Sequence, residues 1–207
     1  MGLDVFVKNI YYFILIGIIS GIVGFLVFNR KTYSRIKYYS EFDPLTKTFN
    51  RRAGITKLNE LFPSDDRRQF LVSLCFIDIN GLKEVNDTLG HKLGDELIIT
   101  VADIIKRTIR EQDFLVRLGG DEFLIVFNGI GIDMAEKIWE RIVQEYNKIN
   151  TTEDRAYLIS VSHGVVDFDN KQKTHVDDLI SAADEKMYHE KQIIKANLSV
   201  IKEHKKN

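Results

Sequence analysis

The strongest structural signals in this chain lie in FIDINGLKEVNDTLGHKLGDEL (76–97) and, a little further on, in RLGGDEF (117–123). The first stretch begins inside QFLVSLCFIDI (69–79), an apolar and β-prone run that is long enough for a buried central strand. From Gly94 to Ile109, apolar residues recur at the spacing of an amphipathic helix. A central strand followed by a helix is therefore predicted.

The glycines of the second stretch predict a hairpin. Residues 114–118 and 122–127 are short strand candidates, and Gly119, Gly120 and Asp121 between them are typical of a hairpin turn. Two antiparallel strands are therefore expected to follow the helix.

Three further elements complete the predicted domain. Asp133 is the expected N-cap of another amphipathic helix, residues 158–166 predict a fourth strand, and residues 176–191 a last helix. Helices mixed with one hairpin favour an α+β domain, in which helices flank a mixed or antiparallel central sheet.

Acidic residues mark the ends of these strands. Asp78 ends the first strand, and Asp121 and Glu122 lie on the hairpin turn. If the strands are neighbours, carboxylate oxygens meet at one edge of the sheet, where they suit a hard cation such as Mg²⁺ that also binds phosphate. The alternative is that these residues are ordinary turn residues.

Polar residues after Asp78 favour the first reading. Lys83, Asn86, His91 and Asp95 add a cation, an amide, an imidazole and a carboxylate near the acidic edge. An amide and a carboxylate can complement a guanine edge, and a lysine can meet a triphosphate. The pattern therefore predicts a nucleotide site.

With these motifs the chain resembles the GGDEF domain of diguanylate cyclases. The resemblance covers about 43–195 and includes DPLTKTFNRR (43–52) and AADEKMYHEK (182–191). It implies a nucleotide-cyclase-like fold and a reaction that joins two GTP into cyclic di-GMP with release of two pyrophosphates. Each 3′-hydroxyl attacks the α-phosphate held by the other subunit, so a homodimer is implied.

The resemblance also implies roles for the acidic edge. Asp78, Asp121 and the carbonyl of Ile79 would bind Mg²⁺, with Mn²⁺ as another possible metal. Asp121 or Glu122 would help to deprotonate the attacking 3′-hydroxyl. Lys83 would stabilise charge on the phosphates.

A second group of residues would bind the nucleotide in the same way. Asn86 and Asp95 would recognise guanine, and His91 would lie beside the nucleotide. Lys191 and Lys195 would contact the terminal phosphates from the last helix.

Arg110 and Asp113 stand where the family has its product-inhibition motif, R-x-x-D, and Arg141 matches a further position of that site. Arginines suit the phosphates of cyclic di-GMP because they form bidentate bonds. The alternative is an exposed Arg–Asp pair at a helix end.

Several residues depart from the family pattern, among them Lys47 where Gly is usual and Leu82 where Phe is frequent. Asn80 stands where the family often has a second Asp, and His163 stands in the fourth strand where Ile is usual. Lys195 replaces part of a usual Gly-Arg pair, so it keeps the charge but lacks the planar guanidinium.

The N-terminal part predicts a membrane anchor. Residues 10–29 contain an apolar run that as a helix would be roughly 28 Å long, which suits a bilayer core. A secretory signal peptide is the alternative, but no A-x-A-like cleavage site follows the run. Residues 1–9 would be extracytoplasmic and 30–42 would form a linker helix.

The flanking charges predict the orientation. Arg30, Lys31 and Arg35 follow the apolar run, so the positive-inside rule places the following domain in the cytoplasm, on a single-pass protein of the cell membrane. Gly17 and Gly21 put small residues on one helix face, a pattern that permits helix dimerisation. Residues 196–207 are expected to be a basic tail.

Composition narrows the class of protein. The chain has 44% hydrophobic and 29% charged residues and a formal net charge of −1, so it lacks the basic excess of a nucleic-acid binder. Cys75 is its one cysteine, which excludes an internal disulfide and favours a reducing compartment.

A membrane-anchored enzyme is the leading hypothesis. A catalytically silent domain that senses cyclic di-GMP and a scaffold are the alternatives.

Overall fold

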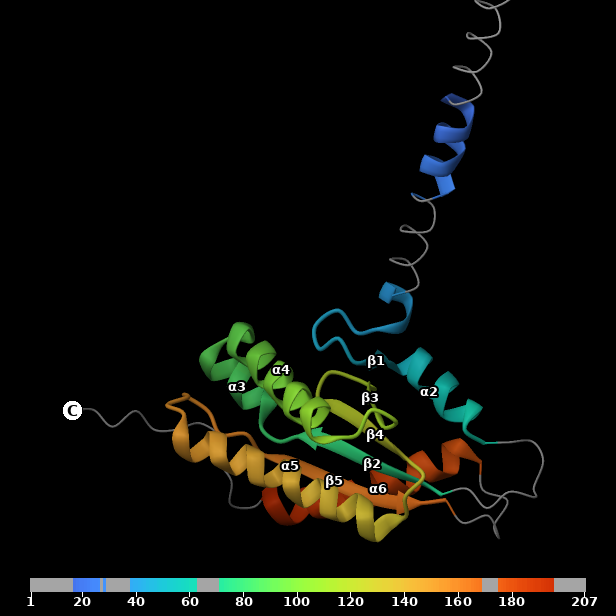
Figure 1. The fold of residues 1–207 in the computed structure, drawn as a ribbon. Coiled ribbons are helices and arrows are strands. Elements are labelled where there is room, and N and C mark those ends of the chain that lie inside the picture. Colours follow the sequence, from blue (N-terminus) through green and yellow to red (C-terminus); the bar gives the residue numbers. More distant parts are fainter. Residues whose placement is uncertain (1–16, 27, 29–37, 63–70, 169–174, 196–207) are drawn as a thin grey trace, which may run out of the picture. The chain divides into compact units, whose positions relative to one another are not determined.

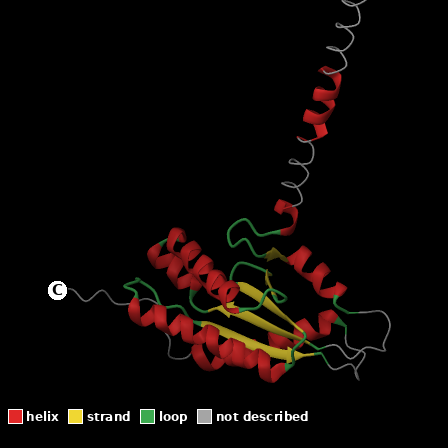
Figure 2. Ribbon diagram, in the orientation of Figure 1, coloured by secondary structure: helices red, strands yellow, loops and turns green. Residues whose placement is uncertain are grey.

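The computed structural model describes residues 17–26, 28, 38–62, 71–168 and 175–195. The domain considered below belongs to the compact unit Glu41–Asn207. Its sheet has the order β1-β3-β4-β2-β5 (Figures 1 and 2). The strands are β1 (Phe49–Asn50), β2 (Val72–Ile79), β3 (Phe114–Arg117), β4 (Glu122–Asn128) and β5 (Val161–Asp167). Since β1 is parallel to β3 and all other pairs are antiparallel, the prediction of a mixed, largely antiparallel sheet is confirmed.

Helices cover both faces of the sheet (Figure 1). One face packs against α3 (Leu82–Leu89), α4 (His91–Thr108) and α5 (Ile132–Thr152). The other face packs against α2 (Arg51–Glu60) and α6 (Val176–Lys195). The result is a three-layer arrangement with the sheet in the middle.

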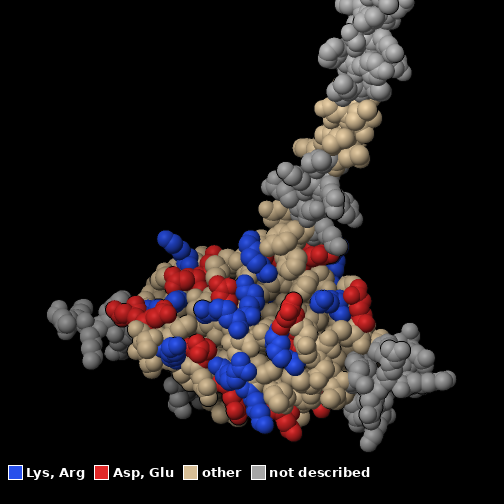
Figure 3. All heavy atoms as spheres, viewed as in Figure 1, with Lys and Arg blue, Asp and Glu red and all other residues tan. Residues whose placement is uncertain are grey.

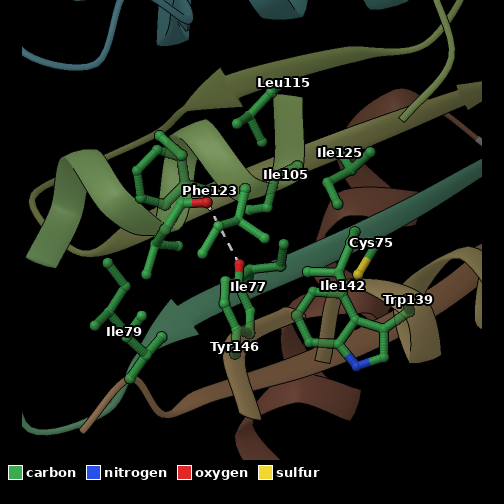
Figure 4. Close-up of a cluster of buried hydrophobic side chains, with 14 of the residues drawn as sticks. Cys75, Ile77, Ile79, Ile105, Leu115, Phe123, Ile125, Trp139, Ile142 and Tyr146 are labelled. Atoms are coloured by element: carbon green, nitrogen blue, oxygen red, sulfur yellow. Dashed lines mark hydrogen bonds between the residues drawn. The ribbon is translucent and has the colours of Figure 1, made fainter. Parts of the chain in front are cut away.

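Strand β2 shows how the sequence builds this arrangement. Alternate side chains of a strand point to opposite faces of the sheet, and every residue of β2 is buried. Cys75, Ile77 and Ile79 enter the core under α4 and α5 (Figure 4). Leu74 and Phe76 enter the core under α2 and α6. The same alternation puts Asp78 on the α6 side, at the end of the strand.

Several predicted boundaries differ from the structure by a few residues, among them the end of the last helix, which reaches Lys195 and not 191. Two of the differences have a clear physical reason. Helix α5 begins at Ile132 with Gly131 as its N-cap, and Asp133 lies in the first turn instead, where its charge favours the helix dipole. Strand β5 begins at Val161 and not at residue 158. The side-chain amide of Asn150 donates to the C=O of Ile159 and accepts from its N–H. The main chain of Ile159 therefore has no group left to pair with a neighbouring strand.

Parts of the predicted N-terminal segment and tail lie outside the described residues. Of 10–29, residues 17–26 and 28 are described and helical, and of 30–42, residues 38–41 form helix. None of the helices within the described ranges combines the length and the apolar character needed to span a bilayer. The membrane helix, the segment 1–9 and the tail 196–207 therefore stay predictions.

Candidate nucleotide and metal site

Strand pairing brings the predicted acidic residues together. Asp78, near the end of β2, pairs directly with Glu122 at the start of β4. The next N–H along β2, that of Ile79, donates to the main-chain oxygen of Asp121 over 3.1 Å. The proposed metal ligands and the candidate base therefore lie at one edge of the sheet, although their roles stay predictions.

Asp78 is the buried member of this group. Its side chain is 7% exposed, and its Oδ1 forms an ion pair with Lys191 Nζ at 2.6 Å. Burial raises the pKa of the Asp78 carboxyl, and the Lys191 ammonium opposes this rise. The negative charges of Asp121 and Asp184 raise the pKa further. A buried carboxylate whose charge is offset by a cation is suited to hold a metal ion in place of that cation.

The donor set fits Mg²⁺ or Mn²⁺ with a bound nucleotide. The described residues contain no group of three or more His, Cys, Asp or Glu side chains placed to hold a metal ion. Two carboxylates, from Asp78 and Asp121, and the carbonyl of Ile79 are nevertheless what such a cation needs when phosphate and water complete its shell. The site is therefore consistent with a metal that arrives with its phosphate ligand.

A pocket of about 690 Å³ opens beside these residues. It brings together Asp121 and the three lysines that the resemblance assigns to the phosphates, Lys83, Lys191 and Lys195. Its other lining residues, to which the sequence motifs give no role, include Glu84, Asp87, Thr88 and Ile194.

The predicted guanine-binding residues lie on the next helices along the chain. A Cβ on Gly94 would collide with Oδ1 of Asn86, so the Asn86 side chain fills the space that the glycine leaves. Asp95 follows on α4, and His91 is exposed at the start of that helix. None of Asn86, His91 and Asp95 is among the lining residues of the pocket beside Asp121.

Arg117 holds the hairpin turn in place. Its Nε and Nη2 donate to the carbonyls of Gly119 and Gly120, at 3.1 and 2.8 Å. Its Nη1 donates to Oδ1 of Asp43 at 3.0 Å, which also accepts from Thr46. Burial alone would raise the pKa of Asp43, but these hydrogen bonds and the Arg117 charge lower it. The turn that carries Asp121 is thus tied to the start of the domain.

Glu122 experiences the summed charge of the site. Burial raises the pKa of Glu122, and the charges of Asp121, Asp78 and Asp184 raise it further, against a smaller opposing effect of Arg51. A Cβ on Gly119 would lie 2.8 Å from Glu122 Oε2, so that glycine leaves room for the carboxylate. Sequence reasoning missed Asp184, although it precedes Lys191 by seven residues and so shares its face of α6.

The predicted inhibitory residues divide between two hollows. Arg110 donates from Nε and Nη2 to the two carboxylate oxygens of Asp113, at 3.0 and 2.8 Å, and both residues line one hollow. Arg141 lines a different one with Arg107, between α4 and α5. In Figure 3, Lys and Arg side chains gather on the face formed by these helices, among acidic ones.

Known proteins are similar to this chain in sequence and in fold. Residues 40–197 match the family described as Diguanylate cyclase, GGDEF domain. The chain belongs to this family, and the predicted resemblance is confirmed.

Individual relatives agree with that assignment. The chain is 38% identical over 156 residues to the bifunctional diguanylate cyclase/cyclic di-GMP phosphodiesterase MucR of Pseudomonas aeruginosa, which covers 72% of this chain and 22% of MucR. It is 30% identical over 154 residues to the probable diguanylate cyclase DgcC of Escherichia coli K12, over 74% of this chain and 41% of DgcC. The chain thus spans less than half the length of either relative.

Solved structures agree as well. The GGDEF domain of DgcB from Caulobacter crescentus, crystallised in complex with c-di-GMP, is 27% identical with a TM-score of 0.67. The match covers 74% of this chain and 91% of that one.

Proposed function

We propose that this protein is a diguanylate cyclase, which condenses two GTP molecules into cyclic di-GMP and releases two pyrophosphates. One observation carries the proposal: in a chain of the GGDEF family, the buried Asp78 lies close to Asp121 and Lys191, beside one pocket. Lys83 and Lys195 add positive charge to the same pocket.

The residues of the site divide the work of binding and proton transfer. Lys83, Lys191 and Lys195 hold the phosphates and offset their charge, because phosphoryl transfer needs positioning and charge neutralisation more than covalent help. Lys191 pairs with Asp78 in this structure and moves to the phosphates when a nucleotide is bound. Glu122, whose pKa is raised, is a better proton acceptor for the 3′-hydroxyl than an ordinary glutamate.

Asp78, Asp121 and the Ile79 carbonyl are the residues that would hold Mg²⁺ or Mn²⁺, which when bound supplies further positive charge at the triphosphate. Asn86 and Asp95 bind the guanine edge, with oxygens that accept from its N–H groups. His91 lies beside the nucleotide.

The reaction requires two copies of the chain. Each domain binds one GTP, and the 3′-hydroxyl of one nucleotide attacks the α-phosphate of the other, so two sites must face one another. We therefore propose a homodimer, to which the small residues Gly17 and Gly21 contribute through helix contact.

We also propose that residues 10–29 anchor the protein in the cell membrane with the catalytic domain in the cytoplasm. The apolar run and the positive charges that follow it support this orientation. Carbonate-resistant recovery of the full chain with the membrane fraction tests the anchor, and release by carbonate would contradict it.

The first test is turnover by the full chain in nanodiscs, supplied with GTP and Mg²⁺ and analysed by mass spectrometry. Wild-type protein should form cyclic di-GMP, and Asp121→Ala should lower the rate by about 10²-fold or more because a metal ligand is lost. The fold should persist, since the hydrogen bond to Ile79 uses the main-chain oxygen of Asp121.

Asp133→Ala is the matched control, because it removes an exposed aspartate from the first turn of α5. It should leave turnover near the wild-type rate. Normal turnover by Asp121→Ala would contradict the assigned metal site. Binding of cyclic di-GMP without any GTP turnover by the wild type would favour the silent sensor instead.

We further propose that cyclic di-GMP inhibits the enzyme at Arg110 and Asp113. Arg110 is 40% exposed on its side chain while Asp113 is buried beneath it, so the guanidinium can reach a phosphate without leaving its partner. Arg110→Ala should leave the initial rate near normal and weaken inhibition by added product about tenfold or more. Product titrations of the initial rate measure this, and an unchanged inhibition constant would refute the assignment.

A further inference from the structure

Helix α6 lies unusually close to β5, the edge strand of the sheet. A Cβ on Gly164 would collide with the backbone of Ala183 and Met187, so only glycine allows this approach. One turn of α6 also hydrogen-bonds to the strand, because Lys186 Nζ donates to the carbonyl of Val165 at 2.8 Å.

The last two turns of α6 are held differently. The buried residues of this helix are Val176, Leu179, Ala183 and Met187, so no residue after Met187 is fully buried. The residues that line the nucleotide pocket, Lys191, Ile194 and Lys195, all come later. Besides the Lys191–Asp78 ion pair, the part of α6 that serves the site therefore needs another contact to hold it.

Glu190 supplies that contact. Its Oε2 accepts from the main-chain N–H of His163 and lies 2.8 Å from the same residue's ring Nδ1. The other ring nitrogen, Nε2, lies 3.3 Å from Oε2 of Glu136 on α5, and the ring stacks on Trp139 with centroids 4.5 Å apart. We name His163, Glu190 and Glu136 the α6 clasp.

The clasp ends one residue before Lys191. We propose that Glu190, held by His163, is a positioning residue that fixes the end of α6 so that Lys191 stands over Asp78 and, with GTP bound, over its phosphates. This inference rests on the proposed function. His163 is the partner that matters for Glu190, because its ring stacks on Trp139 and its Nε2 lies beside Glu136. The ring is thus held in place and forms a rigid anchor for Glu190.

Two measurements on the full chain in nanodiscs test the proposal. The first is the affinity for Mg²⁺ with α,β-methylene-GTP, an analogue whose α–β bridge cannot be cleaved, measured by calorimetry. Glu190→Ala should raise the Kd about threefold to tenfold. Glu185→Ala, the matched control, removes an exposed carboxylate of α6 outside the clasp and should change the Kd less than about twofold.

The second measurement is amide hydrogen exchange without nucleotide. Glu190→Ala should accelerate exchange in residues 188–195 and leave 176–187 unchanged, because the first three turns keep their apolar contacts. Glu190→Gln retains a side-chain oxygen acceptor and should lie between Glu190→Ala and the wild type in both measurements. It also replaces Glu190→Ala should that variant fail to fold.

A double-mutant cycle separates positioning from a general structural role. If Glu190 acts through Lys191, adding Glu190→Ala to Lys191→Ala should weaken binding no further. Additive losses, or an unchanged Kd in Glu190→Ala with faster exchange, would overturn the proposal. A wild-type chain that bound no GTP analogue would overturn the proposed function, and the exchange data would still support or overturn the clasp itself.

Discussion

At the scale of single residues, Gly94 shows how the site depends on an absent side chain. An alanine in the interior of α4 would ordinarily stabilise the helix by about 1 kcal/mol. Here its Cβ would collide with Oδ1 of Asn86, the proposed guanine ligand. Because only the end of a half-buried side chain must move, the fold can accommodate the change but the ligand cannot keep its position.

Gly94→Ala should therefore raise the KM for GTP about tenfold while the melting temperature changes little. Steady-state kinetics and thermal melts on the full chain check both parts. Asn86→Ala is the reference, and the double variant should resemble it, because each change removes the same contact. A normal KM in Gly94→Ala would remove Asn86 from the nucleotide site.

Asn80 gives a structural reason for one departure from the family pattern. Its amide donates to Oγ of Ser160 and accepts from Oγ of Ser162, both at 3.0 Å. The amide thus connects the end of β2 to the start of β5. An aspartate could accept from both hydroxyls as well, but it would bury a second charge two residues from Asp78, whereas the amide is neutral.

At the scale of elements, the parts of the fold that could be predicted were those with strong periodicity. Strands β2, β3 and β4 and the helices α4 and α6 follow from apolar runs, alternation and a glycine turn. The short helices α2 and α3 were not predicted. The signal for α2 was a single residue, Asn50, whose side chain accepts from the N–H of Ala53 as an N-cap.

The candidate site could be predicted as far as the strands determine it. Asp78 and Glu122 pair because register and hairpin turn follow from local sequence. The contribution of α6 could not be derived in that way. Which face of a distant helix meets the strand end depends on tertiary packing, and so Asp184, the clasp and the Lys191–Asp78 contact came from the structure alone.

At the scale of the whole molecule, the acidic edge lowers the stability of the domain that carries it. Asp78 and Glu122 both have raised pKa values, first because they are partly buried and then because of the charges around them. In an acid with a raised pKa, the folded state keeps the proton at a pH where the unfolded state has lost it. The contribution of Glu122 to the free energy of unfolding is therefore most favourable below its ordinary pKa of 4.5. This contribution is lost as pH rises through the higher pKa of the folded state.

Glu122→Gln should consequently melt at a higher temperature than the wild type at pH 7 without metal. Solvent screens this partly exposed carboxylate, so the gain should not exceed about 1 kcal/mol, or about 2–4 °C. The difference should shrink as pH falls toward 4.5, where the wild-type carboxyl gains its proton. It should also shrink when Mg²⁺ is added, since a bound cation offsets the same repulsion. Thermal melts followed by circular dichroism from pH 4 to pH 8, with EDTA or with Mg²⁺, measure all three effects.

A variant that melted below the wild type at every pH would mean that attraction to Arg51 outweighs the repulsion from Asp121, Asp78 and Asp184. With that result the acidic edge would be a stabilising feature of the domain, and its presence would need no catalytic reason.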